Sequence, residues 1–121
     1  MGMLKDKIAA FIEKIRAVDG VTSCALVSRD GIIAGKYFDR DLNEPWFGAL
    51  AATILASSES AGNLVGMKSL GTVSVLGADS SMLIMGAGDH FLIAALLKGD
   101  AQKEETSSQI HAVAAEIGQV M

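Results

Sequence analysis

The sequence predicts an α/β fold of the α+β type, a three-layer α/β/α domain built on a five-stranded antiparallel sheet. Residues 21–28 and 90–97 contain no Asp, Glu, Lys or Arg, and in 90–97 both alternating sets of side chains are apolar. A sheet with one face in water would alternate apolar and polar residues, so these two strands should be central and covered on both faces. Short links between neighbouring strands favour an antiparallel sheet, because parallel neighbours need a crossover of about a dozen residues. The expected order is helix-strand-strand-helix-strand-strand-strand-helix.

The chain opens with a helix that ends at Asp19-Gly20. Its apolar residues recur at a spacing of three or four, which places them on one helical face: Leu4, Ile8, Phe11, Ile12, Ile15 and Val18. Gly20 stands where a helix commonly ends in the left-handed conformation. Residues 21–37 then read as a hairpin. We expect Asp30-Gly31 to form its two-residue type I′ turn, because Asp and Gly tolerate the positive φ that both central positions need.

A second helix is predicted over residues 45–63. Asp41 and Asn43 supply capping side chains, Glu44 places an acid in the first turn, and Pro45 stands early in the helix. Three strands follow over 69–76, 82–87 and 90–97, separated by Gly-, Asp- and Ser-containing turns. A last helix over 101–120 completes the chain, with an inner face formed by Ile110, Val113, Ala114 and Ile117.

Composition indicates one domain, which we assign to residues 3–121. Half of the 121 residues are hydrophobic, so the chain can bury a core without disulfide or metal staples. The net charge of −4 argues against nucleic acid as the main partner. No apolar run approaches the ~18–20 residues of a membrane span, and charges near the start argue against a signal peptide. Because Cys24 is the only cysteine, the expected compartment is the reducing cytoplasm.

The second helix is unusual because Glu59 is the only charged residue between positions 45 and 64. A helix with one face in water usually carries charged residues there. The strand 69–76 likewise lacks the charges or prolines that protect an exposed sheet edge. Both features fit a twofold partner, so we expect a homodimer; the alternative is a monomer with an unused apolar patch. The expected dimer interface consists of Ala49, Ala52, Ala56, Ser60, Leu70, Thr72, Val73, Ser74 and Val75.

The first turns of the same helix are candidates for binding a second kind of partner. The residues concerned are Trp46, Phe47, Leu50 and Thr53. Aromatic side chains dominate many protein interfaces, but Trp46 and Phe47 could equally pin the helix to its own sheet. Consecutive helical residues point about 100° apart, so the two rings cannot both face the same way. Both interpretations remain open at this point.

The sequence gives no support for a catalytic, cofactor or metal site. Gly62, Gly66, Lys68 and Ser69 resemble a phosphate loop, but such a loop needs a strand before it and a helix after it, and here the order is reversed. Cys24 lies in the middle of a strand with no acid or histidine nearby, as expected for a small core residue.

Two further groups are weighed as metal or acid–base sites. His90 and His111 lack neighbouring ligands at a spacing typical of zinc. Asp39, Asp41 and Glu44 lack the Gly and Glu spacing of a calcium loop, so a solvated loop and helix cap explain them better. We therefore expect no enzymatic activity, no cofactor and no bound metal.

The chain resembles the roadblock / dynein light chain domain family over nearly its whole length. The resemblance rests on Asp19-Gly20-Val21 and on three longer segments: VSRDGIIAG (27–35), FGALAATILASSESAG (47–62) and MLIMGAGDHFLIAALL (82–97). It implies a profilin-like fold and a homodimer or heterodimer whose sheet continues through the third strand. It also implies a role beside Ras-like small GTPases, as scaffold or activity regulator, with paired second helices often forming the docking face.

The same resemblance bears on the three arginines of the chain, Arg16, Arg29 and Arg40. With the family layout, Arg16 and Arg29 are expected on the side or end opposite the second helices, and only Arg40 near a docked GTPase. The resemblance implies regulation by reshaping the GTPase rather than by an inserted arginine.

Three functions are therefore considered. The first is a non-enzymatic dimeric regulator or scaffold for a Ras-like small GTPase. The second is a homodimeric assembly module without a GTPase partner. The third is a small-molecule sensor domain, which lacks support because no convergent polar groups interrupt the apolar strands.

Overall fold

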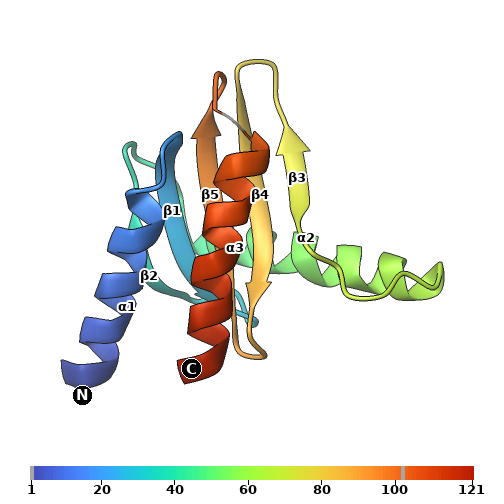
Figure 1. The fold of residues 1–121 in the computed structure, drawn as a ribbon, viewed down its shortest axis with the longest axis horizontal. Coiled ribbons are helices and arrows are strands. Elements are labelled where there is room, and N and C mark those ends of the chain that lie inside the picture. Colours follow the sequence, from blue (N-terminus) through green and yellow to red (C-terminus); the bar gives the residue numbers. More distant parts are fainter. Residues whose placement is uncertain (1, 102) are drawn as a thin grey trace.

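A computed structural model describes residues 2–101 and 103–121. Three helices and five strands follow one another in the predicted order (Figure 1). In chain order the elements are α1 (Gly2–Arg16), β1 (Val21–Ser28), β2 (Ile33–Tyr37), α2 (Glu44–Leu64), β3 (Val73–Leu76), β4 (Ser80–Ala87), β5 (Phe91–Lys98) and α3 (Lys103–Val120).

The strands form one antiparallel sheet in the order β2-β1-β5-β4-β3. β1 and β5, the strands that contain the uncharged segments 21–28 and 91–97, lie inside the sheet and pair with each other, for example Ala25 with Ala94. Both of these alanines are fully buried, as are Leu92 and Ile93, which point to opposite faces of β5. The predicted fold class, including the central place of these two strands, is confirmed.

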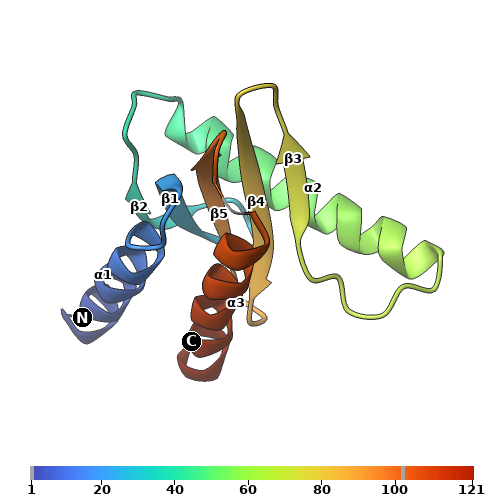
Figure 2. The same cartoon turned by 45° about the horizontal axis from the view of Figure 1, so that its top comes forward.

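Helices cover both faces of the sheet, which gives the three layers. α1 and α3 lie on one face and α2 crosses the other (Figure 2). The larger core lies beneath α1 and α3 and includes Ile15, Met85 and Ile117. A smaller core beneath α2 includes Leu55 and Ile84. The α2 layer is therefore held by fewer large apolar side chains than the opposite layer.

The turn between β1 and β2 differs from the predicted type I′ turn. Gly31 has a φ of +91°, but Asp30 does not adopt positive φ. The Gly31 N–H donates to the Ser28 carbonyl at 2.9 Å, and the Ser28 N–H donates to the Ile32 carbonyl at 2.8 Å. These bonds define a three-residue loop in which a β-turn is followed by a left-handed glycine. The prediction of a two-residue turn was wrong. Asp-Gly is compatible with both the two-residue turn and the three-residue loop, and packing against α2 favours the longer loop.

That packing is a backbone contact between the turn and α2. A Cβ atom added to Gly31 would lie 3.0 Å from the Ala49 Cα atom, and one added to Gly48 would overlap the Gly31 carbonyl oxygen. Two glycines thus allow the turn and the helix to touch without intervening side chains. The contact fixes the first turns of α2 over the β1–β2 end of the sheet.

The third strand is shorter than predicted. β3 begins at Val73 rather than at Ser69, and Ser69 itself has a φ of +35°. Residues 65–72 return the chain from the end of α2, which extends past β3, to the sheet (Figures 1 and 2). This return path prevents residues 69–72 from pairing with β4, although they carry no charge and run directly into the apolar residues of the strand.

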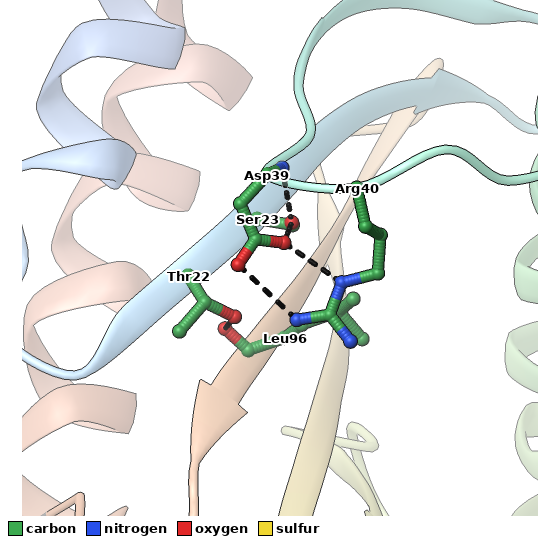
Figure 3. A network of polar contacts seen from close by, with 5 residues as sticks. All are labelled: Thr22, Ser23, Asp39, Arg40 and Leu96. Atoms are coloured by element: carbon green, nitrogen blue, oxygen red, sulfur yellow. Dashed lines mark hydrogen bonds and ion pairs between the residues drawn. The ribbon is translucent and has the colours of Figure 1, made fainter.

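A polar network secures the linker that leads into α2 (Figure 3). The Ser23 hydroxyl donates to Asp39 Oδ1 at 2.7 Å and accepts from the Asp39 N–H at 3.0 Å. Arg40 Nε and Nη2 donate to the two Asp39 carboxylate oxygens at 2.7 and 3.2 Å. These bonds, with that of Arg40 as the largest cause and that of Ser23 next, lower the pKa of Asp39 from 3.8 to about 2.

The helix start itself combines a cap with an aromatic contact. The Asn43 side chain accepts from the Trp46 N–H at 3.1 Å, as a helix N-cap does. Phe47 then meets Phe38 edge to face, with ring centroids 5.5 Å apart. The linker and the first turn of α2 are therefore joined on the side of the helix that carries Phe47.

We predict that Gly31→Ala is more destabilising than Gly66→Ala. Both glycines have positive φ, so either substitution should cost ~1–2 kcal/mol through backbone strain. At Gly31 the added methyl also meets the α2 backbone, whereas nothing lies within 4 Å of a Cβ at Gly66. We expect a total of about 2–4 kcal/mol for Gly31→Ala in denaturant unfolding. Equal losses for the two variants would contradict the backbone contact.

We also predict that the carboxylate of Asp39 titrates near pH 2. A pKa lowered by folding contributes stability that is present above about pH 4 and is lost as the pH falls through about 2. In Arg40→Ala the pKa of Asp39 should rise toward its ordinary value, because the largest cause of the shift is removed. A side-chain NMR titration measures both values. An unchanged pKa in Arg40→Ala would show that the ion pair is not the cause.

Candidate functional site

The exposed face of α2 is uncharged along its full length. Its core-facing residues are Gly48, Ala51, Leu55 and Gly62. The side chains that point the opposite way, at helical spacing, are Trp46, Leu50, Thr53, Ser57, Ser60 and Leu64. Trp46, Leu50 and Leu64 are 64%, 51% and 87% exposed. A 21-residue helix thus presents large apolar and small uncharged side chains to solvent, as interaction surfaces do.

The structure separates the two aromatic residues that open α2. Trp46 lies on the exposed face together with Leu50 and Thr53, three of the four predicted partner-binding residues. Phe47 is half-buried against Phe38 and packs on the smaller core. Phe47 therefore pins the helix to the sheet, while Trp46 is available to a partner. Partner binding by these residues remains a prediction.

The predicted dimer residues fall on two neighbouring surfaces. On α2, Ala49, Ala56 and Ser60 are exposed and Ala52 is half-buried. Around β3, Ser74 and Val75 are exposed, whereas Leu70, Thr72 and Val73 are half-buried. Leu70 and Val73 pack on the core beneath α2. The structure therefore brings only part of the set together: Ala56 and Ser60 lie on the half of α2 nearer β3, whereas Ala49 lies against the β1–β2 turn, at the opposite edge of the sheet.

The end of α2 and the loop after it add exposed apolar residues beyond the predicted interface. They are Leu64, Val65 and Met67. The last turns of α2 extend past β3, beyond the edge of the sheet (Figures 1 and 2). A sequence signal was present, because these residues continue the apolar composition of α2 past its predicted end without a charge until Lys68. What the sequence could not show is that the sheet ends before the helix does.

The two edges of the sheet are unequal. On β2 the register shifts between Ile33 and Gly35, which marks a β-bulge, and Lys36 points outward in an ion pair with Glu44. Bulges and lysines are the usual protection of a sheet edge. β3 carries neither, and both Val75 and Leu76 are exposed. The unprotected edge is therefore the one beside the overhanging end of α2.

An open groove of about 470 Å³ lies between β2 and the first turns of α2. Its lining is mostly apolar and includes Ile32, Ile33 and Pro45. Among the described residues that line it, the charged side chains are Asp30, Lys36 and Glu44, and the last two form an ion pair with each other. The groove can accommodate an apolar side chain of a partner, but it offers few polar groups to orient a small molecule.

The groups with potential for chemistry do not converge. Cys24 is buried, and burial is the main cause that raises the pKa of its thiol to about 11, so the thiolate is not populated near neutral pH. His111 Nε2 lies 3.2 Å from the Thr72 hydroxyl, and His90 precedes β5. In residues 2–101 and 103–121 no three potential ligands come close enough to hold a metal ion. No helix in the same ranges is long and apolar enough to cross a membrane.

Solved structures share this fold over nearly the whole chain. MglB of Myxococcus xanthus superposes with a TM-score of 0.86 at 15% sequence identity, over 94% of each chain. A Roadblock/LC7 domain from Streptomyces avermitilis has a TM-score of 0.77 at 19% identity, over 93% of this chain and 92% of that one. Profilin II of Acanthamoeba castellanii has a TM-score of 0.67 at 14% identity, over 93% and 98%. At these identities the likeness establishes the fold.

No curated protein sequence matches the chain. The family model for the Roadblock/LC7 domain, in contrast, matches residues 7–97, which run from α1 through β5. That range contains the helix with the uncharged exposed face, the unprotected strand and the central pair of strands described above. The chain therefore belongs to the Roadblock/LC7 domain family.

Proposed function

We propose that this protein is a non-enzymatic, dimeric regulator or scaffold of a Ras-like small GTPase. The observation that carries the proposal is the uncharged, exposed outer face of α2. The GTPase as partner rests on the membership of the Roadblock/LC7 family and on the role that the resemblance to that family implies. The alternative is a homodimeric assembly module that acts without a GTPase.

Self-association is supported by two exposed features that lie side by side and that a second copy could cover. β3 has an unprotected outer edge, and the last turns of α2 project beyond it. A second copy related by a twofold axis would pair β3 with β3 and lay α2 against α2, with the same residues on both sides. Small side chains at Ala56 and Ser60 permit close approach of the two helices. The exposed Leu64 and Val65 would then lose contact with water, at about 25 cal/mol per Å² of apolar area.

GTPase binding is assigned to the first half of the same face, around Trp46, Leu50 and Thr53. A tryptophan and a leucine exposed side by side on one helical stripe have the composition of an interface anchor. In the proposed dimer two such surfaces would flank the paired helices. A GTPase could therefore contact one or both subunits.

The contacts of the three arginines favour regulation by reshaping the GTPase over regulation by an arginine inserted into its active site. The Arg16 guanidinium lies 3.8 Å from the centre of the Tyr37 ring. Arg40 is held by Asp39, and Arg29 by Glu59 and the Gly88 carbonyl. An arginine finger accelerates hydrolysis by ~10³–10⁵ only when its guanidinium is free to reach the transferred phosphate. Any effect on GTP hydrolysis is therefore better explained by contacts between α2 and the mobile regions of the GTPase.

The dimer is tested by Ala56→Glu, with Ala112→Glu as its matched control. Both alanines are exposed on helices, α2 and α3, so neither change should alter the monomer fold. A charge buried at a helix–helix interface should raise the dimer dissociation constant at least ~30-fold for Ala56→Glu. Ala112→Glu should leave it unchanged. Analytical ultracentrifugation follows the species of 12.6 kDa and twice that mass. A wild-type monomer at micromolar concentration, or equal effects of the two variants, would contradict the proposal.

GTPase binding is tested by Leu50→Glu, with Leu4→Glu as its control. The two leucines are 51% and 54% exposed, but Leu4 lies on α1, on the other face of the sheet. Purified Ras-like GTPases of the source organism, loaded with GDP or a non-hydrolysable GTP analogue, serve as probes in calorimetry. Leu50→Glu should weaken binding at least ~10-fold, whereas Leu4→Glu and Arg40→Ala should retain it. Absence of binding to all of these GTPases, in both nucleotide states, would favour the assembly module.

A further inference from the structure

Arg29 connects three segments that are distant in the sequence. Its Nη1 atom lies 3.3 Å from each carboxylate oxygen of Glu59 on α2. Its Nη2 atom donates to the Gly88 carbonyl, in the β4–β5 turn, at 2.9 Å, and its backbone N–H donates to the His90 carbonyl at 3.1 Å. Arg29 itself belongs to the β1–β2 turn. The expectation that Arg29 lies away from the second helix was therefore wrong, because this turn folds against α2 through Gly31 and Gly48.

The Arg29 guanidinium lies against a glycine of the sheet. A Cβ atom at Gly86 on β4 would lie 2.7 Å from Arg29 Nη2, so the guanidinium rests directly against the backbone of Gly86 and would have to shift if that residue carried a side chain. Arg29 Nε is buried without a hydrogen-bond partner. The side chain therefore stays in place through its terminal nitrogens, which bond to Glu59 and to the Gly88 carbonyl. A lysine could not replace this forked arrangement, because it has a single charged nitrogen.

The segment on which Arg29 rests is itself supported from the other face. Gly88 has a φ of +75°, and a Cβ there would lie 2.8 Å from the Gly118 Cα atom in α3. The β4–β5 turn is thus pressed against α3 through two glycines. Arg29 therefore ties α2 to a turn that is itself packed against α3.

Glu59 lies at the point along α2 where the contacts between the helix and the sheet end. Before it, Ala51 and Leu55 are buried against the sheet. After it, the remaining α2 residues are exposed except Gly62, which lies against Met67 of the following loop. The helix beyond this point extends past β3 (Figures 1 and 2). The Arg29–Glu59 ion pair therefore lies at the base of the last turns of α2, which project beyond β3.

We propose that Arg29 is a positioning residue that fixes the direction in which the last turns of α2 leave the sheet. This inference rests on the proposed dimer, because those turns carry Ser60 and Leu64 into its interface. A helix free to swing about Leu55 would present this surface in many orientations, and each dimer would have to select one of them. Arg29 would thereby lower the cost of self-association without touching the second copy.

The test compares Arg29→Met and Arg29→Lys with Lys14→Met. Lys14 forms the α1–α3 ion pair with Glu116 at 2.7 Å, so its variant removes an ion pair elsewhere in the fold. The first measurement is hydrogen exchange of the amides at positions 60–66, which cover the last turn of α2 and the two residues after it, at a concentration where the protein is monomeric. We expect exchange about 10-fold faster in Arg29→Met, an intermediate increase in Arg29→Lys, and no change in Lys14→Met. In the two Arg29 variants, hydrogen exchange in α1 and α3 should stay as in the wild type.

The second measurement is the dimer dissociation constant, which should rise about 10-fold in Arg29→Met and not in Lys14→Met. Unchanged exchange at 60–66, or a uniform increase in all three helices, would overturn the positioning role. A local increase in exchange with an unchanged dissociation constant would overturn its link to self-association. If the wild type is monomeric, the dimer fails, whereas the exchange experiment still decides whether Arg29 holds α2.

Discussion

The contact between the backbone of the β1–β2 turn and Gly48 determines where α2 lies, and much of the molecule depends on that position. Gly31 and Gly48 meet without side chains between them. Three of the four buried residues of α2, Gly48, Ala51 and Gly62, are small, so the helix sits close to the strands. Phe47, against Phe38, and Glu59, against Arg29, then fix the helix on either side of its axis. A helix held in this way keeps its large side chains, Trp46, Leu50 and Leu64, on the outside.

The two sides of the sheet are consequently built for different tasks. Beneath α1 and α3, large residues such as Met85, Ile93 and Ile117 fill a continuous core. Beneath α2 the core is smaller. A domain of 121 residues gains most of its stability from buried apolar area, so the first layer supplies the greater share. The α2 layer can then carry an uncharged exposed face, which adds nothing to the stability of the single chain.

Periodicity in the sequence predicted the order of elements and the central strands, because burial on two faces leaves a clear compositional mark. The uncharged segment of β5 is an example, since no wet face could be assigned to it. Three features were beyond such reasoning. The length of the β1–β2 turn, the orientation of Phe47 and the position of the Arg29 guanidinium each depend on a contact with a separate segment of the chain. The contacting residues are Gly48, Phe38 and Glu59, respectively. The exposed face of α2 was anticipated from its lack of charge, but its projection beyond β3 follows from the relative lengths of helix and sheet, which no local pattern records.

In the proposed function one helix serves two partners, and the change of side-chain size along its exposed face is what would allow this. Toward its end, Ala56, Ser57 and Ser60 leave the backbone accessible, and helices approach one another closely where such small residues meet. Toward its start, Trp46 and Leu50 supply apolar area, which favours a groove or patch on a different protein rather than a second copy of the same helix. The proposed dimer would place the small residues at the twofold axis, and Trp46 and Leu50 away from it. Self-association and partner binding would then not compete for the same residues, and both would require α2 to be held rigidly at its root.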